Sequence, residues 1–381
     1  PQRGDSMTGP GSGTPRDLVA GSLQVIGSGQ APTGAFIAGP TFSQYGYSWL
    51  RDGSFIAEGL DLVGQTEASA RFHQWVARVV LASTEGMERA RATAREGGIP
   101  KVEDYLHCRY SADGSPADVD WPTFQLDGPG IWLWSLDNHV RHGGQLDAGL
   151  DAAVDDVARY LADLWATPCA DAWEEYDEHV HTSTLGAIAA GLSAALAIRP
   201  PLASVDAVNH ARDALDARMS VVDGAFTKWS GTSEVDASLL WLAAPYRYLD
   251  PGEPRFAATL RRIEDELISE GLGVHRYRSD TYYGGGAWPV LSSAYARVLI
   301  RRGGPGDLSR ARSVMGWIEA QADEHGHLPE QVPDHAFAPD RIDEWRTLWG
   351  ESARPLLWSH AAYLALRAEL DAVSEVSGRV A

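Results

Sequence analysis

Apolar residues recur at helical spacing along the whole chain, whereas the alternation typical of strands is sparse. The pattern predicts twelve helices, near 15–28, 51–64, 66–87, 126–143, 149–166, 183–198, 204–219, 236–245, 254–269, 287–302, 307–322 and 355–372. Some boundaries have chemical support, because Pro15 follows a capping threonine and Gly64, Gly143 and Gly303 directly follow predicted helix ends. We therefore expect an all-α protein.

The links between these helices alternate in length. After the second, fourth, sixth, eighth and tenth helices the links are short: "GQ", "GGQLD", "RPPLA", "PYRYLDPGE" and "GGPG". The links before the second, fourth, sixth, eighth, tenth and twelfth helices are long, from roughly 15 to about 40 residues. Six helix hairpins joined in this way predict a closed ring of helix pairs, an (α/α)6 barrel, with all six long loops at one end. An open superhelix is the main rival, but it would show internal sequence repeats, which the chain lacks.

Composition narrows the class of partner. The chain has 381 residues, of which 44% are hydrophobic, and we expect residues 1–381 to form one barrel domain with residues 1–14 as a flexible N-terminal segment. The formal net charge of −20 disfavours nucleic acid and anionic membranes as partners, whereas a neutral substrate suffers no repulsion. No run approaches the roughly 18 apolar residues of a membrane span. Cys108 and Cys169 are predicted to be free thiols in a reducing, cytoplasmic compartment.

The long loops are rich in aromatic and charged residues. In chain order they carry Tyr45, Tyr47, Trp49, Arg51 and Asp52; Trp121, Gln125 and Asp127; Trp173, Glu174 and Glu175; Trp229; Arg276, Asp280, Tyr282, Tyr283 and Trp288; and Glu330, Trp345 and Trp349. Flat rings cover the C–H faces of a sugar, while charged groups take hydrogen bonds from its hydroxyls. Any single tryptophan is also explained by packing at the barrel mouth, but their recurrence across six loops favours a pocket for a neutral oligosaccharide.

Two of these residues are candidates for acid–base chemistry. Glycoside hydrolysis needs one protonated and one ionised carboxyl group. Glu174 is the candidate acid, because the neighbouring Glu175 and the apolar wall of Trp173 both favour its protonated form. A solvated acidic loop is the alternative for this stretch, which has five acidic residues between Asp171 and Glu178. The second candidate, Glu330, has a weaker local signal because it is a single glutamate after a proline.

Histidine pairs at His179 and His181, and at His325 and His327, have an unspecific spacing and no accompanying carboxylate–histidine signature. We interpret them as surface or hydrogen-bonding residues. There is also no Walker loop and no dinucleotide-binding glycine motif after a strand. The sequence therefore predicts neither a metal nor a cofactor.

At the aromatic loops the chain resembles glycoside hydrolase family 15, the glucoamylase family, over about residues 15–372. The segment "YGYSWLRD" is similar to the family's Tyr-x-Tyr-x-Trp-x-Arg-Asp motif, which implies that Arg51 and Asp52 hold a terminal glucose and that Tyr45 lies near its anomeric centre. The segment "WPTFQLDGP" resembles Trp-x3-Gln-x-Asp-Gly-Pro, which implies that Trp121 lies beside the catalytic acid.

The remaining motifs follow in the family's order. "DAWEE" resembles Asp-x-Trp-Glu-Glu, which implies that Glu174 is the general acid and that Glu175 binds substrate. "HRYRSDTYYGGGAW" resembles a segment whose arginine and aspartate bind glucose, here Arg276 and Asp280. "LPEQV" is similar to the motif of the general base, which would be Glu330. The expected substrate-binding set is therefore Tyr45, Trp49, Arg51, Asp52, Trp121, Trp173, Glu175, Arg276, Asp280, Trp288 and Trp358, the last from "PLLWSHAAYLAL" in the final inner helix.

The resemblance implies an inverting enzyme that releases β-glucose from the non-reducing end of α-glucans. Bacterial family members usually carry an N-terminal β-sandwich domain and fungal ones often a starch-binding module, whereas this chain has only about 14 residues before its first predicted helix. In this respect it is similar to isomaltose-type members, which cut α-1,6 links in short oligosaccharides, and we favour that substrate. An α-1,4 preference comes next and a trehalase-like activity third.

Two other classes of protein remain as alternatives. A polysaccharide lyase with a helical barrel favours acidic sugars, which the net charge of −20 disfavours, and it gives no role to Glu174 with Glu330. A non-catalytic sugar-binding protein would keep the aromatic residues and need neither glutamate.

Overall fold

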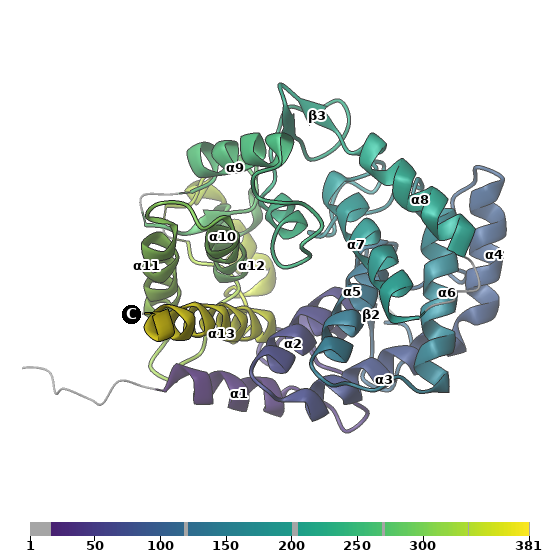
Figure 1. The fold of residues 1–381 in the computed structure, drawn as a ribbon, viewed down its shortest axis with the longest axis horizontal. Coiled ribbons are helices and arrows are strands. Elements are labelled where there is room, and N and C mark those ends of the chain that lie inside the picture. Colours follow the sequence, from purple (N-terminus) through teal and green to yellow (C-terminus); the bar gives the residue numbers. More distant parts are fainter. Residues whose placement is uncertain (1–16, 118–120, 200–204, 269–270, 334, 381) are drawn as a thin grey trace, which may run out of the picture.

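The computed structural model describes residues 17–380 apart from 118–120, 200–204, 269–270 and 334, and within this part the chain forms a ring of helices around a central axis (Figure 1). The inner ring consists, in the described residues, of α2 (Leu50–Leu62), α5 (Asp127–Arg141), α7 (Thr182–Ile198), the 3-10 helix η2 (Ala237–Leu242), α10 (Pro289–Arg302) and α13 (Leu357–Val380). Each packs on the next, and α13 packs on both α10 and α2. This last contact closes the ring, which excludes an open superhelix.

A second layer of helices surrounds the ring (Figure 1). It consists of α1 (Leu18–Ser28), α3 (Thr66–Ala82), α6 (Ala148–Leu164), α8 (Val205–Arg218), α9 (Pro254–Glu266) and α11 (Asp307–Ala320). Short links join inner to outer helices, for example residues 63–65 between α2 and α3 and residues 303–306 between α10 and α11. The predicted (α/α)6 barrel is thus confirmed. The predicted cap at residues 14–15, the flexible segment 1–14 and most of the link "RPPLA" lie outside the described residues.

Three details of the helix prediction were wrong. The predicted helix 66–87 is broken at Ser83, where the hydroxyl donates to the Val79 carbonyl at 2.9 Å; such back-bonding bends helices, and a separate helix, α4 (Thr84–Arg95), follows. The predicted helix 236–245 is the short η2, because Pro245 cannot continue a helix. The sixth long loop contains a helix that was not predicted, α12 (Ile342–Trp349).

Short strands fasten the loops to one another. In the described residues they form three antiparallel pairs: β1 (Ser48–Trp49) with β2 (Arg109–Tyr110), β3 (Val221–Val222) with β4 (Ala225–Phe226), and β5 (Val274–His275) with β6 (Ala287–Trp288). Both β1 and β6 end in a tryptophan that is the residue before an inner helix, Trp49 before α2 and Trp288 before α10. These pairings therefore fix the side chains that enter the barrel from its loop end.

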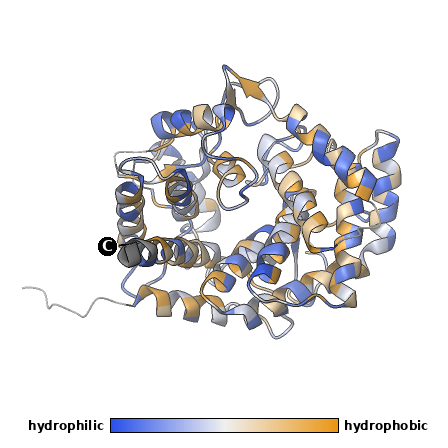
Figure 2. Cartoon of the chain, viewed as in Figure 1, coloured by the Kyte–Doolittle hydropathy of each residue, from blue (hydrophilic) through white to orange (hydrophobic). Residues whose placement is uncertain are grey.

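Burial follows the two-layer arrangement. Figure 2 shows the inner helix α7 in white to orange and the outer helix α8 with many blue positions, as expected if only one face of the outer layer meets the core. On the barrel axis, Phe55 stacks on Trp358 with ring centroids 4.9 Å apart, and Trp241 packs on the same tryptophan at 5.6 Å. Cys108 and Cys169 are buried free thiols. Among the described residues, none of the helices has the length and apolar character that a membrane span needs.

Candidate active site

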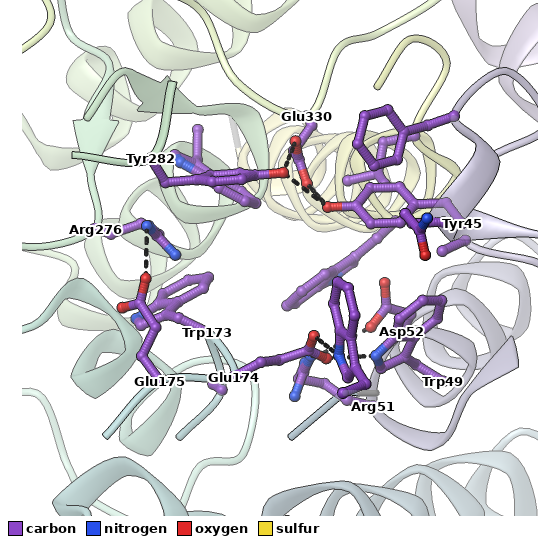
Figure 3. Close-up of a pocket in the computed structure, with 18 of the residues that line it drawn as sticks. Tyr45, Trp49, Arg51, Asp52, Trp173, Glu174, Glu175, Arg276, Tyr282 and Glu330 are labelled. Carbon is purple, nitrogen blue, oxygen red and sulfur yellow. Dashed lines mark hydrogen bonds and ion pairs between the residues drawn. The ribbon is translucent and has the colours of Figure 1, made fainter. Parts of the chain in front are cut away.

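A pocket of about 320 Å³ opens at the end of the barrel where the inner helices begin and the long loops gather (Figure 3). This volume is at the lower end of the range for small-molecule sites. The residues that line it are Ala38, Phe42, Gln44, Tyr45, Trp49, Arg51, Asp52, Trp121, Pro122, Ala172, Trp173, Glu174, Glu175, Arg276, Tyr282, Trp288, Glu330, Trp345, Trp349, Leu356 and Trp358. Trp358, which is packed against Phe55, forms part of the floor.

The carboxylate of Glu174 is held from one side of the pocket by three donors. Its Oε1 accepts hydrogen bonds from the Trp49 indole at 2.5 Å and from the Arg51 guanidinium at 3.3 Å. Its Oε2 accepts one from the indole of Trp121. The resemblance predicted that Trp121 lies beside Glu174, and the structure brings them together. These donors fix the direction in which the carboxyl group faces the cavity.

The loop that carries Glu174 adopts an unusual backbone conformation. Glu174 has a φ of 69°, in the left-handed region that side chains other than glycine rarely adopt. The Asp171 side chain stabilises this turn, because its Oδ1 accepts from the backbone N–H of Trp173 at 2.9 Å and of Glu175 at 3.0 Å. The acidic stretch is therefore an ordered turn rather than a solvated run over Asp171–Glu175.

A buried lysine from the fourth loop anchors this turn. The Lys228 ammonium lies 3.4 Å from Asp171 and 3.4 Å from Asp236, and all three side chains are almost fully buried. Asp236 in turn accepts a hydrogen bond from the Trp173 indole at 3.0 Å. The ammonium also lies 3.2 Å from the ring centroid of Tyr277, a cation–π contact. Sequence reasoning missed Lys228 because no motif surrounds it.

Glu330 faces the cavity from the side opposite Glu174 (Figure 3). Its Oε1 accepts a hydrogen bond from the Tyr45 hydroxyl at 2.5 Å, and its Oε2 accepts from Ser352 at 3.0 Å and from Tyr282 at 3.4 Å. Burial raises the pKa of Glu330, and the hydrogen bonds from Tyr45 and Ser352 oppose that rise because they stabilise the ionised form. The resemblance implied only that Tyr45 lies near the anomeric centre of a glucose, whereas the structure shows that Tyr45, Tyr282 and Ser352 all donate to Glu330.

A second group of charges lies beside Glu174. Arg276 is paired with Asp280 through two contacts, Nε to Oδ2 at 2.7 Å and Nη2 to Oδ1 at 2.5 Å, and its Nη2 also lies 3.4 Å from Glu175. Asp280 is fully buried behind the arginine and is not among the described residues that line the pocket, so it positions Arg276. Burial raises the pKa of Glu175, and Arg276 and a hydrogen bond from the Tyr277 hydroxyl oppose it.

Asp52 has fewer donors than the other carboxyl groups of the pocket. Its closest cation is Arg51, whose Nε lies 3.6 Å from Oδ2, while the same guanidinium makes a 3.2 Å ion pair with Asp127. Burial raises the pKa of Asp52 to about 7; Arg51 opposes the rise, and the negative charges of Glu174 and Glu330 add to it. This carboxyl group is thus available for the hydroxyls of a ligand.

Of the expected site residues, all except Asp280 line the pocket. Three other loop aromatics lie elsewhere: Trp229 stacks on His179 with centroids 4.5 Å apart, Tyr47 lies against the Arg109 guanidinium, and Tyr283 packs on Trp345 with centroids 6.0 Å apart. Arg109 also lies 4.1 Å from the Trp121 ring centroid, so it packs behind one of the donors to Glu174. No sequence motif distinguishes this arginine from any other.

The histidine pairs do not reach the pocket. His181 hydrogen bonds to the Tyr176 carbonyl at 2.9 Å, as expected for a hydrogen-bonding residue. Among the described residues, one group of side chains lies close enough together to hold a metal ion, namely Asp61, His73 and His139. It is buried near the C-terminal ends of α2 and α5, at the other end of the barrel from the pocket.

The environment of Asp52 gives a prediction about stability. Its pKa in the folded state, about 7, exceeds the value of about 3.9 expected in the unfolded chain, so the unfolding free energy falls as the pH rises from about 4 to about 7. Asp52→Asn removes this loss, and we expect it to raise Tm by about 2–5 °C at pH 8 and by much less at pH 4. Asp213→Asn, at a side chain that is 76% exposed, is the control and should show neither change. A Tm gain of equal size at both pH values would contradict the assignment.

Comparisons with known proteins agree on one family. A model described as "Glycosyl hydrolases family 15" matches residues 13–304. The chain is 42% identical to an isomaltose glucohydrolase of Kribbella flavida over 364 residues, which cover 93% of this chain and 92% of the relative. It is 28% identical to a trehalase of Mycolicibacterium smegmatis, over 78% of this chain and 48% of that protein.

Solved structures give the same result. A wild-type glycosidase matches with a TM-score of 0.86 and 40% identity, covering 93% of this chain and 96% of that one, and a variant glycosidase in complex with glucose matches equally well. A bacterial glucoamylase complexed with acarbose, at 18% identity, shares the fold with a TM-score of 0.68 over 93% of this chain and 56% of its own. The chain therefore belongs to glycoside hydrolase family 15 and is a glycoside hydrolase.

Proposed function

We propose that this enzyme releases glucose from the non-reducing end of short α-glucosides, with α-1,6-linked isomaltose and isomalto-oligosaccharides as its preferred substrates. The observation that carries the proposal is the position of Glu174 and Glu330 on opposite sides of one pocket (Figure 3), of whose floor Trp358 forms part. A pocket that ends within the barrel admits one chain end, which favours exo-acting cleavage. In this proposal the whole barrel is the catalytic domain.

The two glutamates divide the chemistry between them. Glu174 protonates the departing glycosidic oxygen, while Glu330 removes a proton from a water on the opposite face of the sugar ring. The water attacks the anomeric carbon as the glycosidic bond breaks, so an α-link yields β-glucose without a covalent intermediate. The 2.5 Å hydrogen bond from Tyr45 and the 3.0 Å hydrogen bond from Ser352 orient Glu330 for this step.

The charges at the inner end of the pocket hold the terminal glucose. Asp52 and Glu175 accept hydrogen bonds from its hydroxyls, and Arg51 and Arg276 donate to them. Each such hydrogen bond with a charged group is worth about 1.5–3 kcal/mol. We call these four side chains, Arg51, Asp52, Glu175 and Arg276, the glucose clamp. Because each of them is almost fully buried or ion-paired, the clamp can bind glucose without large rearrangement.

Similarity to the Kribbella flavida enzyme supports the α-1,6 preference, since it extends over 93% of this chain at 42% identity. The second candidate is trehalose, which is favoured by the matches to several trehalases at 22–28% identity. An α-1,4 preference, as in glucoamylases, is the third.

A substrate screen tests the proposed function. We expect glucose release from isomaltose with a higher kcat/KM than from maltose, panose or trehalose. Glu174→Gln and Glu330→Ala should each lower kcat by about 10²–10⁴-fold, because each removes acid or base assistance. Glu178→Gln is a matched control, since it makes the same change in the acidic loop at a side chain that is 64% exposed. A tenfold advantage for maltose or trehalose would replace the α-1,6 proposal, and no glucose from any of the four would refute an exo-acting α-glucosidase.

The surroundings of Glu330 predict a change in pH dependence. Ser352→Ala removes a hydrogen bond that stabilises ionised Glu330, so the pKa of this buried group rises further. The base must be ionised to act, and the acidic limb of the kcat/KM profile should therefore move to higher pH. Ser313→Ala, at an exposed serine in α11, should leave the profile in place. A shift of the alkaline limb instead would contradict the role of Glu330 as base.

A further inference from the structure

We propose that α12 is the platform for the acceptor sugar, the glucosyl unit on the leaving-group side of the scissile bond, and that Trp349 with Trp345 binds it. This inference rests on the proposed function and adds the residues that select substrates by their second sugar. The sixth loop contains the helix α12, which neither the barrel architecture nor the catalytic step accounts for.

Both ends of the segment that contains α12 lie beside Glu330, the proposed base. Glu330 lies before the segment, and its backbone N–H donates to the carbonyl of Ala353, which lies after it, at 2.9 Å. Ser352, just beyond the helix, donates to the Glu330 carboxylate at 3.0 Å. The helix is therefore mounted directly beside the reacting centre.

Contacts with the fifth loop hold α12 over the pocket. The Tyr283 hydroxyl donates to the Gly350 carbonyl at 2.9 Å, and the backbone N–H of Ala338 donates to the Gly284 carbonyl at 2.8 Å. Gly284 has a φ of 83°, and a Cβ there would lie 2.6 Å from the Cγ1 of Ile342, so only glycine allows this approach. The helix is thus an ordered part of the pocket wall.

Two tryptophans of α12 point in the same direction. Trp345 and Trp349 are four residues apart, which places them on one helix face, and both line the pocket. Trp345 packs edge-on against Tyr282 with centroids 5.0 Å apart. Trp349 remains 45% exposed, whereas Asp52 at the inner end of the pocket is 7% exposed. This gradient places the Trp349 ring at the mouth.

The position of these rings matches the path of the substrate. The clamp at the inner end holds one glucose, so the second sugar of a disaccharide must lie toward the mouth, beside α12. An α-1,6 link contains one more rotatable bond than an α-1,4 link, so the link itself does not fix the orientation of the second ring. A flat indole that packs on the C–H face of that ring supplies the missing constraint. Without such a ligand, the half-exposed Trp349 ring would leave apolar surface in contact with water at the pocket mouth.

The test compares two substrates that differ only in the leaving group. Isomaltose carries an acceptor glucose, whereas α-D-glucosyl fluoride carries a single fluorine atom that does not reach α12. We expect Trp349→Ala to lower kcat/KM for isomaltose by about tenfold or more, chiefly through KM, and to change it for the fluoride by less than about twofold. Trp349→Phe, which keeps a flat ring, should recover most of the activity on isomaltose. Leu348→Ala is the matched control, because this neighbour is 63% exposed and does not line the pocket.

Four outcomes would overturn the platform. Equal losses on both substrates would mean that Trp349 supports the glutamates rather than the acceptor, and no loss on isomaltose would mean that it binds nothing. If Trp349→Ala converts a dimer into a monomer in gel filtration, the exposed face of α12 is a protein interface instead. A wild-type enzyme that is inactive on both substrates contradicts the proposed function itself, and the platform with it.

Discussion

The pocket is lined by four carboxyl groups, Asp52, Glu174, Glu175 and Glu330, and by two guanidinium groups, Arg51 and Arg276. This excess of carboxyl groups over cations governs the contacts within the site, because each carboxylate that is withdrawn from water needs its own hydrogen-bond donors. Glu174 takes indole and guanidinium donors, Glu330 takes hydroxyls, and Glu175 is paired with Arg276. The Asp52 carboxylate has the fewest stabilising partners, and burial raises its pKa to about 7. The unequal distribution of donors gives chemically similar groups different environments, and the proposed mechanism assigns them different roles.

The barrel makes this concentration of charge possible. Its closed ring brings the first turns of the inner helices to one end, and the loops before them meet over a common floor. Within that frame, the strained turn at Glu174 is held by Asp171, and Asp171 is held by Lys228. The buried ammonium also contacts Asp236, so a single lysine ties the loop that carries Glu174 to the start of η2. The geometry of the Glu174 carboxylate therefore depends on Asp171 and Lys228, which do not line the pocket.

Much of this arrangement was predictable from the sequence. Helical periodicity and the alternation of link lengths gave the barrel, because both are local properties of the chain. The motifs gave thirteen site residues, and of these only Asp280 lies behind the pocket wall. The rest was not predictable for physical reasons. Lys228, Arg109 and Ser352 act through contacts between distant loops, which leave no local pattern. Residues 88–95 of α4 and all of α12 bury few apolar side chains, so no core-facing periodicity marks them as helices.

In the proposed mechanism Glu174 and Glu330 act together, as acid and base, from opposite faces of one glycosidic bond. Proton NMR of the first turnovers on isomaltose tests it most directly, because the anomeric protons of the two glucose anomers are resolved before they interconvert. The account predicts that β-glucose appears first from the non-reducing unit, with the α-anomer forming only afterwards by mutarotation. If α-glucose from that unit appears first, the reaction retains configuration, and the division of roles between the two glutamates is contradicted.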